Sequence, residues 1–379
     1  MSARGSPASF EIARPDDWHL HLRDGALLER VVPATARRFG RAIVMPNLVP
    51  AVTTVDRALA YRERILAACP ADADFEPLMT LYLTDETPVS EIEAAARSPH
   101  VAGVKAYPRG ATTHSSEGVS DLAARADVLE ALASSGLPLL VHGETTDPEC
   151  DVFDRERVYL EETLSKVIDR HPALRVVFEH ITTREAVRFV REAPARVAAT
   201  ITPQHLILDR NALFAGGLRP HHYCLPVPKR ARDRRALLEA ATSGDPSFFL
   251  GTDSAPHTRA AKEADCGCAG IYSAPVALEA YAEAFASVGA LERLEGFASH
   301  FGADFHGLPR NADRLRLVAQ PWSPPISEGE GESALRVFLG GQELRYRVVD
   351  RGSGAGRHFG GNAPETKEKA GGGGNRTRP

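Results

Sequence analysis

Residues 175–202, RVVFEHITTREAVRFVREAPARVAATIT, contain one complete unit of the pattern that organises this chain. An apolar, β-branched run at 175–180 predicts a strand, and REAVRFVREA at 184–193 has the apolar spacing of a helix. A second apolar run, RVAATIT at 196–202, predicts the next strand. A strand, a helix and a further strand in this order are typical of parallel sheets whose helices lie outside.

The same unit recurs on both sides of this stretch, with DRALAYRERILAA at 56–68 as another predicted helix. The further predicted strands are FEIARPDDWHL at 10–20, IVM at 43–45, LMTLYL at 78–83, VAGVKAY at 101–107, PLLVHG at 138–143 and FFLGTD at 248–253. Eight such units in one chain most simply close into a barrel. We therefore predict an α/β protein, a (β/α)8 TIM barrel of the metal-dependent hydrolase type, with its active site at the carboxyl ends of the strands.

The last part of the chain differs in composition. Residues 351–379 are rich in glycine and charge and contain almost nothing apolar to bury, which predicts a disordered tail. Residues 1–350 are assigned to the barrel domain, with the segment at 323–349 expected to pack on its outside as strands or loops.

Composition limits the classes of protein to consider. The 379 residues are 43% hydrophobic and 25% charged, with a net charge of -5 and no basic stripe, so we expect no nucleic-acid partner. Five scattered cysteines and an amino terminus without an apolar signal favour the cytoplasm. No run approaches the roughly 20 apolar residues that a membrane-spanning helix needs.

Five polar residues stand at the ends of predicted strands. His19 and His21 are two positions apart, so a strand end would point both imidazoles to one side. His142, His180 and Asp253 each follow directly on an apolar run. In a barrel these side chains would converge on one mouth, and a set of imidazoles with a carboxylate suits Zn²⁺ better than Mg²⁺ or Ca²⁺.

Lys105 lies inside VAGVKAY, where a barrel interior should be apolar. One interpretation is an ion pair inside the barrel. The other is that burial lowers the pKa of the amine, which then adds carbon dioxide and becomes a carbamate bridging two metal ions. Periodicity does not decide between them.

Several stretches of the chain resemble the motifs of a known family. The stretches that carry the resemblance are DDWHLHLRDG (16–25), MPNL (45–48), GVKAYP (103–108), ATTHSSEGV (111–119), LLVHGE (139–144), FEHIT (178–182), HHYCLP (221–226), GTDSAPH (251–257) and GCAG (267–270). They are similar to the motifs of the dihydroorotases of the amidohydrolase superfamily, in particular the single-domain class found in many bacteria. The resemblance implies reversible cyclisation of N-carbamoyl-L-aspartate to L-dihydroorotate in pyrimidine biosynthesis, and a homodimer.

The resemblance also implies two zinc ions per subunit. One would be held by His19, His21 and Asp253, the other by His142 and His180, with N6-carboxylated Lys105 and a hydroxide bridging them. Asp253 is then placed to act as the catalytic acid and base, because a carboxylate beside the reacting bond can carry the proton between water and the ring nitrogen.

The substrate would meet residues from several loops. The resemblance implies that Arg23, Asn47 and His257 grip its carboxylate and that Thr112 and Thr113 close over it. The remaining predicted substrate contacts are His21, His142, Leu225 and Ala269, the last two through the backbone that reads the pyrimidine ring.

Other residues that might bind metal are set aside. Cys266 and Cys268 have no second cysteine pair nearby. His205, His221 and His222 are expected to be structural or to support the ligands, and the histidines without a strand-end context are expected to be solvated or locally bonded: His114, His171, His300, His306 and His358.

Two alternatives remain. Hydantoinases and allantoinases share the histidine, lysine and aspartate pattern, but their H-x-H follows a longer amino-terminal segment, and an arginine and an asparagine suited to a free carboxylate favour dihydroorotate. A catalytically inactive homologue that serves in assembly would be expected to lack metal ligands, whereas every position is filled here.

Overall fold

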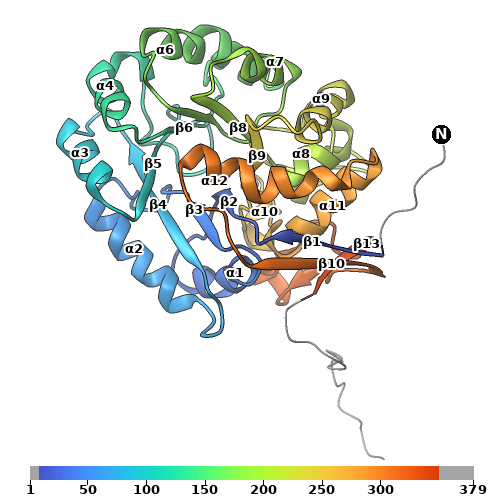
Figure 1. Ribbon diagram of the computed structural model, residues 1–379. Coiled ribbons are helices and arrows are strands. Elements are labelled where there is room, and N and C mark those ends of the chain that lie inside the picture. The colour runs from blue at the N-terminus through green and yellow to red at the C-terminus, as the bar shows by residue number, and fades with distance from the viewer. Residues whose placement is uncertain (1–7, 350–379) are drawn as a thin grey trace, which may run out of the picture.

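The computed structural model describes residues 8–349, and its centre is an eight-stranded parallel barrel (Figure 1). The strand order follows the sequence from β2 to β9, so strands that are consecutive in the chain are parallel neighbours joined by crossover connections, as the repeated units predict. The barrel strands are β2 (Asp17–Leu20), β3 (Arg41–Val44), β4 (Glu76–Leu83), β5 (Val101–Ala106), β6 (Leu139–Val141), β7 (Val176–Phe178), β8 (Val197–Ile201) and β9 (Phe248–Leu250).

The ring closes between its first and last strands just beyond the end of β9. The Asp253 amide donates to the His19 carbonyl at 2.8 Å, and the His21 amide donates to the Ser254 carbonyl at 2.9 Å. The predicted barrel is thus confirmed, and residues of the predicted site make its closing bonds.

Helices surround the barrel on its outside (Figure 1). The predicted helices at 56–68 and 184–193 are α2 and α7. The helices are α1 (Ala26–Ala36), α2 (Val55–Ala68), α3 (Val89–Arg97), α4 (Ala126–Ser135), α5 (Arg155–Tyr159), α6 (Ser165–Arg170), α7 (Arg184–Glu192), α8 (Pro203–Ile207), α9 (Ala231–Ala241), α10 (Arg259–Lys262), α11 (Ala277–Ser287) and α12 (Phe301–His306).

The prediction of one strand over residues 10–20 was wrong. The segment forms two strands in different sheets, β1 (Ser9–Ala13) and β2, because Pro15 lacks an amide donor and interrupts the ladder. The carboxylate of Asp16, next to the proline, forms a buried ion pair with Arg41 at 2.6 Å. That pair fixes the start of β2 beside β3.

A small antiparallel sheet, in the order β1-β10-β13, joins the two ends of the described chain. It consists of β1, β10 (Arg314–Trp322) and β13 (Leu344–Val349), and β11 (Ser327–Glu328) pairs with β12 (Leu335–Arg336). The expectation that 323–349 forms strands or loops outside the barrel is confirmed. The tail predicted at 351–379 lies outside the described residues.

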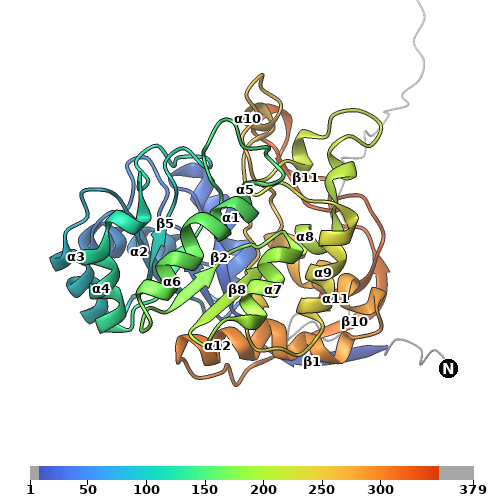
Figure 2. The ribbon, with the colours of Figure 1, turned by 90° about the horizontal axis from the view of Figure 1, so that it is seen from above.

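The apolar core has two parts. The larger lies between strands and helices, and the smaller fills the barrel interior with residues that include Trp18, Leu140 and Phe249. Helix α12 covers one end of the barrel, where Ala303 joins the inner cluster. Figure 2 shows α12 at the end opposite α10, which follows the carboxyl end of β9. The mouth of the barrel is therefore on the side of α10.

The close approach of α12 to the barrel floor gives a stability prediction. A Cβ added to Gly302 would lie 2.0 Å from Nε1 of the buried Trp18 ring. We expect Gly302→Ala to lower the free energy of unfolding by about 2 kcal/mol or more, because the packed indole cannot move aside. Urea denaturation measures this change. In a Trp18→Phe background, which lacks the pyrrole atoms, the same substitution should cost less; an equal cost in both backgrounds would contradict the steric explanation.

Candidate active site

The strand-end residues predicted from the sequence converge at the mouth of the barrel. His19 is in β2 with His21 just beyond it, while His142, His180 and Asp253 follow β6, β7 and β9. All except His21 are buried, and the side chain of His21 is 10% exposed. Polar groups held this far from water need partners, so their arrangement limits what they can bind.

His19, His21 and Asp253 form one compact group. The Asp253 Oδ1 lies 3.4 Å from His19 Nε2 and 3.2 Å from His21 Nε2. Burial alone would raise the pKa of Asp253, but the bonds from the two imidazoles hold it well below its ordinary value. The group therefore offers an ionised carboxylate beside two ring nitrogens, and its ligand atoms are close enough to hold one metal ion.

His180 lies beside a second group. Its ring centroid is 4.8 Å from that of His19 and 4.9 Å from that of His142. Ligand atoms of His19, Glu179 and His180 are near enough to share a metal ion. His142 instead contacts Glu144, with Nε2 3.0 Å from Oε2. The rings of His142 and His180 are thus neighbours, as predicted, but His142 does not belong to either of the compact groups of potential metal ligands in the described residues.

Lys105 is fully buried and contacts the carboxylate of Glu179. The other oxygen of Glu179 lies 2.8 Å from His19 Nδ1. Burial lowers the pKa of Lys105, while Glu179 acts in the opposite direction. Burial would also lower the pKa of His19, but Glu179 and Asp253 raise it to about 9. The ion pair that the sequence left open is present, and Glu179 is its other member.

The sequence interpretation missed Glu179, Glu144 and Asp17. Asp17 accepts from the Thr252 amide at 2.8 Å and from the Thr252 hydroxyl, and so ties β2 to the loop after β9. Glu179 and Glu144 adjoin the histidine positions in FEH and HGE. The sequence signal for Glu179 and Glu144 is an acidic residue close to a strand-end histidine. The sequence does not show whether such a side chain points into the barrel or away from it.

Three predicted site residues have a strained backbone. Arg23, His180 and Asp253 have φ angles of 61°, 44° and 42°, in the left-handed region that side chains other than glycine rarely adopt. Such strain of about 1–3 kcal/mol persists only where the surroundings enforce it, and it is concentrated at functional sites. Here it aims each side chain into the mouth of the barrel.

A narrow cavity lies above these groups. It is lined by His21, Arg23, Asn47, Tyr107, Thr112, Thr113, His142, His180, Leu225, Asp253, Ala255, Ala269 and Gly270. Every predicted substrate contact except His257 is in this lining. Its free space of about 20 Å³ holds a water molecule rather than a pyrimidine ring. Because the Thr113 carbonyl accepts from Asn47 Nδ2 at 3.0 Å, the segment that carries the two threonines lies against the other side of the cavity.

Arg23 lines this cavity and contacts His257, which lies outside the lining. The guanidinium donates from Nε to the Pro256 carbonyl at 3.0 Å, and its Nη2 lies 2.9 Å from His257 Nε2. Burial and the nearby Arg23 cation lower the pKa of His257 to about 2, so its imidazole is neutral. Arg23 is 8% exposed and forms no ion pair with an acidic residue between positions 8 and 349. It is thus a buried cation on which Asp253 acts only at a distance, with no carboxylate bonded to it in this part of the chain.

The residues set aside in the sequence are elsewhere. Cys266 and Cys268 are free, and neither takes part in a metal-binding group within the described chain. His205 is buried and lies 2.9 Å from the Pro226 carbonyl, while His221 contacts Glu263 at 3.0 Å, as expected of structural residues. His306, expected to be solvated or locally bonded, instead stacks its ring on Trp18, and its buried Nε2 has no hydrogen-bond partner within the described residues. His358 lies outside the described residues.

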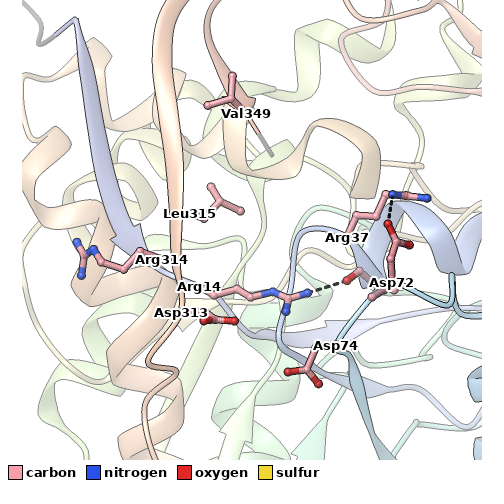
Figure 3. Close-up of a pocket in the computed structure, with 10 residues that line it drawn as sticks. Arg14, Arg37, Asp72, Asp74, Asp313, Arg314, Leu315 and Val349 are labelled. Atoms are coloured by element: carbon pink, nitrogen blue, oxygen red, sulfur yellow. Dashed lines mark hydrogen bonds and ion pairs between the residues drawn. The ribbon is translucent and has the colours of Figure 1, made fainter. Parts of the chain in front are cut away.

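A larger cavity of about 290 Å³ lies at the other end of the barrel (Figure 3). Its walls come from segments that precede β2, β3, β4 and β10 and from β10 and β13 themselves. Figure 3 shows arginines interleaved with aspartates, including Arg37 and Asp72 at 3.6 Å. The residues that line it are Arg14, Ala36, Arg37, Asp72, Ala73, Asp74, Asp313, Arg314, Leu315 and Val349. Barrel chemistry occurs at the carboxyl ends of strands, so this mixed-charge cavity is assigned to stability.

Fold and site together define a barrel hydrolase, and comparison with known proteins agrees. Residues 16–317 match the amidohydrolase family, and the chain belongs to that family, in its dihydroorotase branch. It is 61% identical over 338 residues to the dihydroorotase of Alkalilimnicola ehrlichii, and the matched region covers 89% of this chain and 98% of that relative. The resemblance drawn from the sequence motifs is therefore confirmed.

Two solved structures are similar over nearly their full length. The dihydroorotase of Campylobacter jejuni is 35% identical with a TM-score of 0.82, covering 90% of this chain and 97% of that protein. A dihydroorotase of Saccharomyces cerevisiae in complex with 5-fluoroorotic acid is 32% identical with a TM-score of 0.84, covering 91% and 99%. Within residues 8–349, no helix has the length and apolar character required to span a bilayer.

Proposed function

We propose that this protein is a dihydroorotase that interconverts N-carbamoyl-L-aspartate and L-dihydroorotate in pyrimidine biosynthesis. The observation that carries the proposal is the buried Arg23 cation, which forms no ion pair with an acidic side chain of residues 8–349 and lies in the same cavity as Asp253 and the imidazoles. A cation of this kind is stabilised by an anion, and a planar guanidinium suits the free carboxylate of dihydroorotate. An uncharged hydantoin would leave it unpaired.

The donor set supports a metal centre. The Nδ1 atom of the buried His180 has no hydrogen-bond partner within the described residues, and the two ring nitrogens of His19 face the carboxylates of Glu179 and Asp253. We assign one Zn²⁺ to His19, His21 and Asp253 and a second to His142 and His180. When bound, a metal pair supplies polarisation of the substrate carbonyl and a lowered pKa for the attacking water. The chain's own residues do the rest.

Lys105 is assigned as the residue shared by the two metals. Its neutral amine would add carbon dioxide, forming the N–C bond of a carbamate and releasing one proton. Complete burial favours the neutral amine, and the surrounding imidazoles supply a cluster in which a new anion has partners. The ion pair with Glu179 is the alternative state of the same lysine, so the two interpretations differ in a measurable property, the metal content.

Asp253 carries the proton in this proposal. In ring opening, water attacks the ring carbonyl carbon, the bond from that carbon to the ring nitrogen breaks, and Asp253 moves the proton of the water to the departing nitrogen. In ring closure the carbamoyl nitrogen gives a proton to Asp253 as it attacks the side-chain carboxyl group, the bond from that carbon to its hydroxyl oxygen breaks, and the hydroxyl leaves as water with the proton returned by Asp253. The depressed pKa of Asp253 makes the carboxylate available as a base.

Arg23, Asn47 and His257 are assigned to the substrate carboxylate. Asn47 connects two parts of the site, because its Oδ1 lies 2.9 Å from His21 Nδ1 while its amide group bonds to Thr113. These residues orient the substrate without touching the bond that reacts. Thr112 and Thr113 close the cavity, and backbone groups of Leu225 and Ala269 contact the ring.

The clamp gives a prediction for binding. Arg23→Met should raise the Michaelis constant for dihydroorotate by about 10- to 100-fold, because one charge-assisted contact is lost, while both metals are retained. Steady-state kinetics with metal analysis on the same sample measure both quantities. Arg310→Met, which removes an exposed arginine paired with Asp304, serves as the matched control. An unaltered Michaelis constant in the Arg23 variant would rule out the clamp.

The function itself is tested by following the ultraviolet absorbance of dihydroorotate during hydrolysis, with hydantoin and allantoin in parallel and metal measured per chain. We expect turnover of dihydroorotate with about two metals per chain. Two metals without that turnover would assign the site to another cyclic amide, and absence of metal would favour an inactive homologue. A homodimer in the cytoplasm is part of the same proposal, and light scattering should give the mass of two chains.

A further inference from the structure

Lys262 is a buried lysine that the proposed mechanism does not use. It is the last residue of α10, the short helix at the mouth of the barrel (Figure 2), and it is 3% exposed. Its Nζ donates to the carbonyls of Tyr223, Cys268 and Gly270 at 2.7, 2.8 and 2.8 Å. An ammonium group has three N–H donors, so its hydrogen-bonding capacity is filled by backbone oxygens alone.

The absence of an acid makes this arrangement unusual. No acidic side chain of residues 8–349 forms an ion pair with Lys262, and the titratable groups that act on it are the thiols of Cys224 and Cys268 and the Arg23 cation. A buried ammonium without a counter-ion is costly unless other polar groups offset the loss of water. Here the three carbonyl dipoles do so, and they in turn would repel one another without the cation. Lysine and carbonyls are therefore stable only together.

The three carbonyls belong to the two loops that form one wall of the active-site cavity. Tyr223 precedes Leu225 by two residues, and Cys268 and Gly270 flank Ala269 on both sides. Leu225 and Ala269 both line the cavity. A single ammonium thus fixes the backbone next to each of them.

Backbone hydrogen bonds also hold these loops, but each joins only one pair of residues, whereas Lys262 Nζ binds all three carbonyls. The Gly270 amide donates to the Tyr223 carbonyl at 3.0 Å, and the Cys268 amide donates to the Ala261 carbonyl at 2.9 Å. Gly270 has no space for a side chain, because an added Cβ would lie 2.4 Å from the Ala255 carbonyl oxygen. The backbone position of Gly270 is therefore fixed by close packing. Through its bonds to Tyr223, Cys268 and Gly270, Lys262 holds the backbone of both loops in place as well.

We propose that Lys262 is a positioning residue that holds the backbone of Leu225 and Ala269 in register with the substrate ring and so determines recognition of the ring rather than of the carboxylate. This inference rests on the proposed function. In this proposal the cavity has two parts. Arg23 binds the carboxylate of the substrate, and the backbone that Lys262 holds contacts the cyclic amide.

The test compares two ligands in purified, metal-loaded enzyme. Dihydroorotate uses both parts of the cavity, whereas succinate, measured as a competitive inhibitor, offers carboxylates without a ring. Lys262→Met should raise the Michaelis constant for dihydroorotate by about tenfold or more, with the inhibition constant of succinate and the metal content unchanged. Arg23→Met should weaken both ligands. Lys166→Met, at an exposed lysine, should change neither.

A conservative variant distinguishes positioning from general stability. Lys262→Arg keeps the charge, but its planar fork cannot direct three donors as an ammonium does, so we expect a selective rise of about threefold for dihydroorotate. If the methionine variant does not fold, the test uses the arginine variant alone, through the same two constants for dihydroorotate and succinate. An unchanged ratio of the two constants in an active enzyme, or an equal loss for both ligands, would overturn the inference. An inactive wild-type enzyme would instead overturn the proposed function and this inference with it.

Discussion

Asp253→Asn should reduce the turnover number for dihydroorotate by about 1000-fold or more while most of the metal is retained. The amide keeps the shape and one oxygen that can face the imidazoles of His19 and His21, but it cannot accept the proton of the attacking water. The loss should appear in the turnover number more than in the Michaelis constant, because the substrate carboxylate is bound elsewhere. Stopped-time absorbance assays and metal analysis of the same preparation measure these effects.

The matched control is Asp72→Asn, which makes the same chemical change at a side chain that is 76% exposed. It should leave both turnover and metal content unaltered. Full activity in the Asp253 variant would remove the acid and base role. Loss of all metal together with activity would show that the carboxylate acts mainly as a ligand.

Lys105→Ala should lose at least one metal ion per chain, and turnover should fall by more than about 100-fold. The expectation follows from the carbamate assignment, in which this residue contacts both ions. Added short carboxylic acids should restore part of the activity, because they can occupy the space and supply the missing anion. Metal analysis with and without such an acid is the measurement.

Lys105→Arg separates the two interpretations of this lysine. Arginine keeps a cation opposite Glu179 but does not form the carbamate. If the residue serves only in the ion pair, the arginine variant should keep its metals and the alanine variant should be destabilised by about 3–5 kcal/mol with metal still bound. Unchanged metal content in the alanine variant would therefore contradict the bridging role.

The barrel was predictable because strand and helix periods alternate without ambiguity along most of the chain. Seven of the apolar runs became the expected barrel strands, from β3 to β9, with ends that differ by a few residues. The error at residues 10–20 had a local cause. An alternating apolar pattern does not say which sheet a strand joins, and Pro15 is the residue of this segment that marks the break between the two strands.

The site was predictable in its membership rather than in its contacts. Strand-end position located His19, His142, His180 and Asp253, because β-strand geometry decides which residues reach the barrel mouth. The partners of Lys105 and His142 were not predictable, since Glu179 and Glu144 lie beside the ligands in sequence and their direction depends on tertiary packing. Lys262 was missed for the same reason: its three acceptors are backbone oxygens, which leave no mark on the sequence.

The bonds between Asp253 and His19 and between Ser254 and His21 bear on how the protein is made. A ribosome that has delivered the chain only as far as β8 has already supplied all four site histidines, Lys105, Arg23 and Asn47. The nascent chain still lacks its last barrel strand, the carboxylate and both closing bonds. The residues that complete the ring therefore also complete the proposed metal-binding group, so a chain that ends before Asp253 lacks both the closed barrel and the carboxylate.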